Sequence, residues 1–272
     1  LTALIFRTGL SFLSLKLGTA LIGILTLPYV YLLGKEYGGA RAGLFALFLF
    51  GIAYWTNLIS RIGLRFPLYP VFVAPLFFYL VRGLRTRNRN DFLLAGLFLG
   101  LGLHGYSPFR IVPLLVIAAF VVYVLHMRTK ESAVQSLWWL VILVIVSLIV
   151  FLPLLRFWFE NPDIFGYRAL TRLTSAEAAL PAPAWQVFLS NMYKALLMFN
   201  WDNGGIWVHS IPDRPALDVV TAALFLFGVV LLLVRYAQRP HWQDLFLLIS
   251  IPILLLPSIL SLAFPDENPS LN

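Results

Sequence analysis

The chain has 272 residues, of which 60% are apolar and only 12% are charged, and its mean hydropathy is +0.87. A polypeptide of this composition cannot stay dispersed in water, so soluble folds are excluded and lipid is the expected solvent. The formal net charge is +8, but the basic residues stand in short clusters between apolar runs, which is typical of membrane topology and argues against nucleic-acid binding.

Apolar segments long enough to cross a bilayer recur along the whole chain. A bilayer core takes roughly 20 helical residues, and runs such as LVILVIVSLIVFLPLL lack the alternation of barrel strands. The predicted fold is therefore all-α, a polytopic transmembrane bundle of about eight spans forming a single domain over 1–272. The spans are predicted at 15–34, 41–59, 66–82, 91–106, 108–126, 136–156, 216–235 and 242–263.

The fourth predicted span is short and rich in glycine, AGLFLGLGLHGY, and runs directly into SPFR. Helices in lipid tolerate such irregular backbone only where it is buried in protein or lines a cavity. We therefore expect a break near residue 105 whose backbone lines a cavity.

The short connections on one side of the predicted bundle are far more basic than those on the other side. The positive-inside bias makes this side cytoplasmic. Its basic residues are Lys35, Arg41, Arg82, Arg85, Arg87, Arg89, Arg128, Lys130, Arg235 and Arg239. The segment 157–215 then becomes one long extracytoplasmic loop of a multi-pass cell-membrane protein. Within it, the helical spacing of AWQVFLSNMYKALLMF predicts an interfacial helix at about 184–199, lying on the outer membrane surface.

Two arginines follow the second predicted span, in NLISRIGLR. Arg61 and Arg65 are four residues apart, so they share one face if the helix continues, and two guanidinium groups at that spacing could hold a phosphate. The alternative is that both side chains reach for lipid headgroups at a helix end.

A second polar cluster, LHGYSPFR, lies at the outer ends of the fourth and fifth predicted spans. His104 could exchange protons and Arg110 could bind a phosphate, with Tyr106 between them. A tightly turned helical hairpin explains the same residues equally well.

The third cluster, FNWDNGGIWVHSIPDRPALD, carries Asp202 and His209 in a loop punctuated by glycine and proline. Carboxylates beside aromatic rings suit sugar hydroxyls and ring faces, so this is a candidate substrate loop. Asp218 at its end is interpreted as a helix N-cap in preference to a ligand. The chain has no cysteine, so a cysteine metal site is excluded, and no residues are predicted as metal ligands. It also has no P-loop, Rossmann glycine pattern or HExxH zinc motif, so nucleotide-driven and protease mechanisms lack support.

The segments FGIAYWTNLISRIGLRFPLYPVF, RGLRTRNRN and AGLFLGLGLHGYSPFRIVPLL carry a family resemblance. The chain resembles the membrane glycosyltransferases of the dolichyl-phosphate-mannose protein mannosyltransferase and aminoarabinose transferase group, glycosyltransferase family 39. The resemblance is strongest over 15–126. It implies a GT-C fold and transfer of a sugar, as in hexosyl or pentosyl transfer, from a polyprenyl-phosphate donor to an acceptor on the extracytoplasmic face.

The resemblance also implies roles for residues. Arg61 would neutralise the donor phosphate, and His104 to Arg110 would line the same cavity. The family's essential aspartate stands in a loop that we expect to precede Leu1, so the chain is expected to be part of a longer protein and its catalytic residues are unknown.

The alternative function is a non-catalytic structural subunit of a larger membrane complex. The expected partners are the lipid bilayer and a polyprenyl-phosphate-linked sugar. Other membrane subunits and a divalent metal cofactor are left open, and nucleic acid is not expected.

Overall fold

Helices make up all the regular structure in the part of the chain that the computed structural model describes, which is residues 11–127, 130–174, 179–205 and 211–263. This confirms the all-α prediction. The elements are α2 (Phe12–Ile52), α3 (Tyr54–Arg61), α4 (Leu68–Thr86), α5 (Arg89–Leu103), η1 (Ser107–Ile111), α6 (Val112–Met127), α7 (Lys130–Glu160), α8 (Pro162–Leu173), α9 (Ala184–Leu197), α10 (Val219–Gln238) and α11 (Trp242–Ile259).

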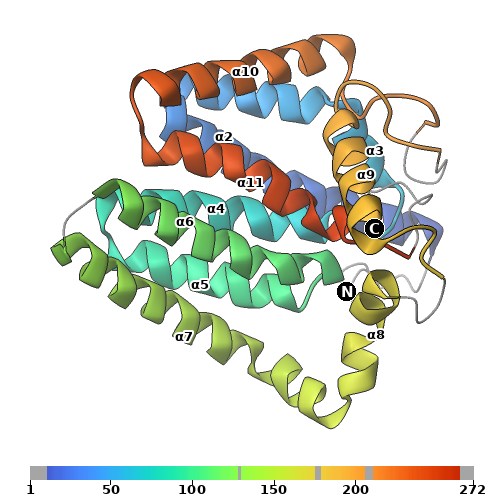
Figure 1. The fold of residues 1–272 in the computed structure, drawn as a ribbon, viewed down its shortest axis with the longest axis horizontal. Coiled ribbons are helices and arrows are strands. Elements are labelled where there is room, and N and C mark those ends of the chain that lie inside the picture. Colours follow the sequence, from blue (N-terminus) through green and yellow to red (C-terminus); the bar gives the residue numbers. More distant parts are fainter. Residues whose placement is uncertain (1–10, 128–129, 175–178, 206–210, 264–272) are drawn as a thin grey trace.

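The first element, α2, is a helical hairpin whose two arms meet at Gly38 and Gly39. Gly39 has a φ of 79°, a conformation that glycine adopts without strain. The arms pack closely, because a Cβ at Gly43 would lie only 2.6 Å from the Tyr31 carbonyl oxygen. The first predicted span and most of the second therefore lie within one folded-back element, and the end of the second falls in α3 (Figure 1).

Six helices in the described residues are long and apolar enough to cross a membrane: α2, α4, η1 with α6, α7, α10 and α11. The prediction of about eight spans differs in two places. Two predicted spans correspond largely to the two arms of α2, which count as one helix here, and the span predicted at 91–106 corresponds to α5, which has 15 residues. A helix of that length covers only about 22 Å. Its neighbours α4 and α7 cover much of its surface, so it does not depend on lipid contact along its whole length.

The core lies between α4, α5, α6, α7 and α11, where Leu80, Phe92 and Phe246 are fully buried. The glycines of α5 serve the packing against α7, since a Cβ at Gly96 would lie 2.6 Å from the Leu143 carbonyl oxygen. Small residues let membrane helices approach closely in this way. The break expected after this glycine-rich span is present at His104 and Gly105, and Tyr106 and Pro108 just beyond it line a cavity.

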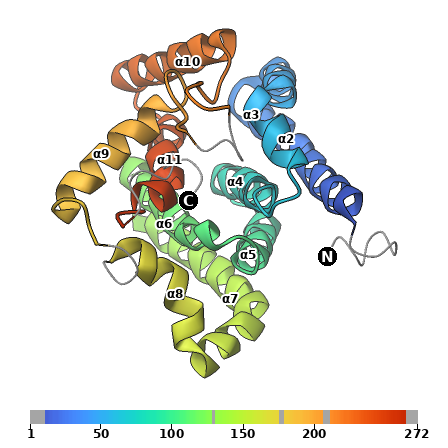
Figure 2. The same ribbon diagram turned by 90° about the vertical axis from the view of Figure 1, so that its right-hand side faces the viewer.

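The bundle has two different ends (Figure 1). At one end lie the α2 turn at Gly38 and Gly39, the α4–α5 turn and the α10–α11 turn, and we call this the turn end. At the other end, α3, α8 and α9 lie across the ends of the long helices, and we call this the cavity end (Figure 2). The assignment of the turn end to the cytoplasm remains a prediction.

The segment between α7 and α10 contributes two helices, α8 and α9. The Asn191 side chain ties α9 to the end of α11, since its Nδ2 donates to the carbonyl oxygens of Ile259 at 3.1 Å and Ser261 at 3.2 Å. The sequence predicts a helix at 184–199, and α9 covers Ala184–Leu197. Its location on a membrane surface remains a prediction.

Candidate functional site

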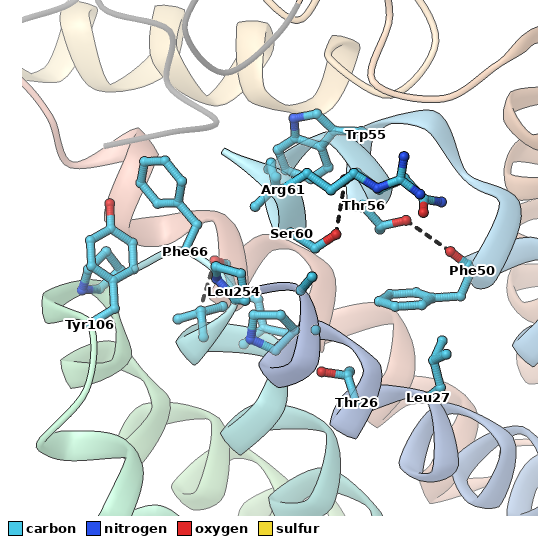
Figure 3. Close-up of a pocket in the computed structure, with 18 of the residues that line it drawn as sticks. Thr26, Leu27, Phe50, Trp55, Thr56, Ser60, Arg61, Phe66, Tyr106 and Leu254 are labelled. Atoms are coloured by element: carbon cyan, nitrogen blue, oxygen red, sulfur yellow. Dashed lines mark hydrogen bonds between the residues drawn. The ribbon is translucent and has the colours of Figure 1, made fainter. Parts of the chain in front are cut away.

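A cavity of about 430 Å³ opens at the cavity end of the bundle (Figure 3). Its walls come from both arms of α2, from α3, from the start of α4, from the last turns of α11 and from short stretches at 106–108 and 198–199. Most of the lining is apolar, as at Ile24, Phe50 and Leu254. The polar side chains that reach it are Thr26, Thr56, Asn57, Ser60, Arg61, Tyr69, Tyr106 and Ser258.

The rim of the cavity is a break in the helix between α2 and α3. Ala53 has an extended ψ of 127°, which leaves backbone carbonyl groups without helical partners. Thr56 Oγ1 donates to the Phe50 carbonyl oxygen at 2.9 Å, and Asn57 Nδ2 donates to the Gly51 carbonyl oxygen at 2.7 Å. These hydrogen bonds stabilise the break, so the donors of Thr56 and Asn57 are already used by the protein itself.

Arg61, the last residue of α3, lines this cavity. Its side chain runs along the rim toward Thr56 (Figure 3). Within the described part of the chain, no hydrogen bond or ion pair engages its guanidinium group. A guanidinium group at the edge of an apolar cavity, with its donors free, is suited to binding an anion in a bidentate manner.

Arg65 does not share a helix face with Arg61, which corrects the sequence interpretation. The helix ends at Arg61, and Gly63 turns the chain away with a φ of 80°. The Arg65 guanidinium instead lies over the Tyr106 ring, 5.3 Å from its centroid. Tyr106 itself is buried, lines the cavity and packs edge-on against Phe66. Arg65 therefore contacts the lining residue Tyr106 but does not itself line the cavity.

His104 turns away from the cavity, toward α7. Its Nε2 lies 2.8 Å from the Val150 carbonyl oxygen, and its ring packs against Phe151. Because the carbonyl can only accept, Nε2 carries the proton in this contact. The sequence interpretation put His104 in the same cavity as Arg61, and the turn at the end of α5 is the reason that it lies elsewhere.

Arg110 is engaged by α8. Its Nη1 donates to the Phe165 carbonyl oxygen at 2.7 Å, and the guanidinium carbon lies 3.7 Å from the centroid of the Phe165 ring. The structure thus brings Arg61 and Tyr106 together at one cavity, but it does not bring His104 and Arg110 there.

Comparison with known families adds to this geometry. Residues 1–157 match the family model described as dolichyl-phosphate-mannose-protein mannosyltransferase. The chain belongs to this family. No curated protein and no solved structure matches the chain. Membership confirms the resemblance and makes the chain a membrane glycosyltransferase, in a family whose donor is a polyprenyl-phosphate sugar.

The mannosyltransferase match covers much of the candidate site. Arg61, Tyr106 and the walls from α2, α3 and α4 fall within 1–157, whereas residues 198–199 and the wall from α11 lie beyond it.

The two predicted sugar-loop residues have different outcomes. Asp202 is exposed, and its Oδ1 accepts a hydrogen bond from the Gly204 amide at 2.7 Å, which stabilises a local turn. It does not line the cavity. His209 lies outside the described residues.

Asp218 caps α10, which confirms the N-cap interpretation. Its Oδ1 accepts from the amides of Val220 and Thr221, each at 3.0 Å, and its Oδ2 accepts from the Thr221 hydroxyl at 2.6 Å. The hydrogen bond from the Thr221 hydroxyl, followed by those from the backbone, lowers the pKa of the Asp218 carboxyl below its ordinary value.

Sequence reasoning missed Thr26, whose side chain lies in the deep wall of the cavity (Figure 3). It is 1% exposed, and its hydroxyl has no hydrogen-bond partner among the described residues. A hydroxyl within an apolar membrane span is a signal that could have pointed to it. In the same part of the chain, no three His, Asp or Glu side chains are grouped in a way that could hold a metal ion.

Proposed function

We propose that this chain moves a sugar from a polyprenyl-phosphate donor to an acceptor hydroxyl on the extracytoplasmic face, and that Arg61 binds the donor phosphate at the cavity rim. The observation that carries the proposal is the Arg61 guanidinium, without a counter-ion among the described residues, at the edge of an apolar cavity of about 430 Å³. The cavity would accept part of the isoprenoid chain, and the rim would accept its charged end.

The charge balance of the reaction explains why a cation is needed at this position. The acceptor oxygen forms a bond to the anomeric carbon of the sugar while the bond from that carbon to the phosphate oxygen breaks. The electron pair of the broken bond leaves with the polyprenyl phosphate, which gains negative charge, and the acceptor proton goes to a general base. A preorganised guanidinium group near the departing phosphate lowers the free energy of this transition state, most strongly where water is excluded.

The general base is not assigned to any described residue. The family resemblance gives this role to an aspartate, for which no residue of this chain is proposed. The proposal for this chain therefore concerns donor binding and stabilisation of the leaving group, with Arg61 as the residue that touches the phosphate and Tyr106 as part of the wall beside it.

The extracytoplasmic location rests on the distribution of charge. The turn end carries the basic connections, and the cavity lies at the opposite end. With the turn end on the cytoplasmic side, as the positive-inside bias predicts, the donor phosphate would bind at the outer membrane surface.

A photoreactive polyprenyl phosphate added to membranes that contain the protein tests donor binding directly. We expect Arg61→Ala to lose most of the crosslinking, because the phosphate loses the guanidinium contact that Arg61 provides at the rim. Arg156→Ala is the matched control, since Arg156 is an exposed arginine that pairs with Glu160 on α7 and does not line the cavity. Equal crosslinking of the parent protein and Arg61→Ala would contradict the proposal.

A further inference from the structure

The charges at the turn end are divided into a paired and an unpaired set. Every carboxylate whose side chain is described there has an arginine partner: Glu36 pairs with Arg85, Asp91 with Arg82, and Asp244 with Arg235. These three ion pairs are neutral, and each of them links two helices or the two arms of a hairpin.

The α4–α5 and α10–α11 hairpins use the same device. In both, an arginine near the end of the first helix binds an aspartate in the first turn of the second helix, nine residues further along the chain. Arg82 Nε lies 3.0 Å from Asp91 Oδ2, and Arg235 Nε lies 2.7 Å from Asp244 Oδ2. Both aspartates are buried, so their negative charges are balanced by these arginines and do not offset the other cations at the turn end.

Five cations at the turn end remain, exposed and without a hydrogen bond or ion pair among the described residues. They are Lys35, Arg41, Arg87, Arg89 and Arg239, and we call them the turn-end cations. The ion pair between Arg85 and Glu36 joins the α4–α5 turn to the α2 turn, which gathers four of the five on two neighbouring turns.

The apolar surface beside these cations indicates what they face. Leu44 and Phe45, one turn after Arg41 in the second arm of α2, are exposed hydrophobic side chains of a membrane-span candidate. A cation one turn from a lipid-exposed surface lies at the level of lipid headgroups. Phosphate groups of lipids are therefore the anions within reach.

We propose that the turn-end cations form a binding surface for anionic phospholipid headgroups, separate from the cavity at the other end of the bundle. The guanidinium groups of Arg87 and Arg89 bind the headgroup phosphates, and Lys35 and Arg41 complete the positive surface. Each cation near a charged membrane strengthens the attraction on the order of fivefold, so the surface as a whole gives a clear preference for anionic over zwitterionic lipid.

The experiment reconstitutes the protein in phosphatidylcholine vesicles and compares the association of spin-labelled phosphatidylglycerol with that of spin-labelled phosphatidylcholine. The test variant carries Arg87→Asn and Arg89→Gln. Asparagine is chosen at position 87 because Arg87 has a φ of 56°, which asparagine tolerates better than most residues. A second variant, Lys35→Gln with Arg41→Gln, removes two cations from the other turn.

The matched control carries Arg156→Gln and Arg214→Gln, which remove two positive charges from the cavity end outside the cavity lining. We expect each turn-end variant, which removes two cations, to lower the preference for phosphatidylglycerol about 25-fold, the control to leave it unchanged, and 1 M salt to weaken it in the parent protein.

An unchanged preference in both turn-end variants would overturn the proposal, as would an equal loss in the control. Absence of any preference in the parent protein would also overturn it and would favour an acidic protein as the partner of these cations. The measurement does not depend on sugar transfer, so its outcome is independent of the role of Arg61.

Discussion

The arginines at the two ends of the bundle differ in their hydrogen-bond and ion-pair partners. At the turn end, Arg82 and Arg235 are bound by buried carboxylates of the next helix. At the cavity end, Arg110 binds a backbone carbonyl and Arg65 lies over an aromatic ring, whereas Arg61 has no partner among the described residues. An arginine whose charge is balanced inside the fold stabilises the fold, and one whose charge is left unbalanced beside a cavity is available to a ligand.

The largest effect that this comparison predicts is at Arg61. Arg61→Ala should lower the rate of sugar transfer by about 10²–10³, the usual loss when one donor to a developing oxyanion is removed. Arg61→Lys should recover part of the rate, since an ammonium group keeps the charge but not the planar fork. Single-turnover transfer of a labelled sugar measures both. Equal rates for Arg61→Ala and the parent protein would contradict the claim that Arg61 at the cavity end binds the donor phosphate.

The second effect is on stability at the turn end. Asp91→Ala leaves Arg82 without its carboxylate and should lower the free energy of unfolding by about 2 kcal/mol. The loss is smaller than for a fully buried pair because the Arg82 side chain is 36% exposed and solvent screens its charge. Thermal unfolding in detergent checks this. Glu160→Ala, which breaks the exposed pair with Arg156, is the control and should cost no more than about 0.5 kcal/mol.

The third effect distinguishes the structural role of Arg110 from the ligand-binding role proposed for Arg61. Arg110→Gln removes the charged donor to the Phe165 carbonyl and should lower stability by about 1.5 kcal/mol, with the loss concentrated in α8. Hydrogen exchange should quicken in Pro162–Leu173, while photocrosslinking of the polyprenyl phosphate stays near that of the parent protein. Loss of crosslinking with unchanged exchange in α8 would instead make Arg110 a ligand-binding residue.

The smallest effect concerns the Asp218 cap of α10. Asp218→Ala should cost about 1 kcal/mol at neutral pH. Because the folded-state pKa of Asp218 is lowered, its ionised form stabilises the fold above the ordinary carboxyl pKa. That contribution is lost as the pH falls through the lowered folded-state pKa. Hydrogen exchange at the start of α10 as a function of pH measures the change. Asp218→Asn, which still caps but does not titrate, should remove the pH dependence attributable to this residue.

Prediction from sequence worked where the signal was local. The membrane helices follow from long apolar runs, and the Asp218 cap follows from an aspartate directly before such a run. The prediction that Arg61 and Arg65 share a face depended on a continuous helix, and Gly63 ended that continuity. The prediction for His104 failed because a single turn after α5 decides whether a side chain meets the cavity or α7, and sequence spacing does not specify that direction.

By itself, the sequence determined that this protein is a helical membrane protein with basic connections at one end, since hydropathy and charge clusters are properties of short segments. Only the tertiary structure decided which arginines have partners, because the Asp91 and Asp244 carboxylates and the Phe165 carbonyl group reach their arginines through the packing of whole helices. Arg61 is likewise available to bind an anion because no described residue of a neighbouring helix forms a hydrogen bond or ion pair with its guanidinium group.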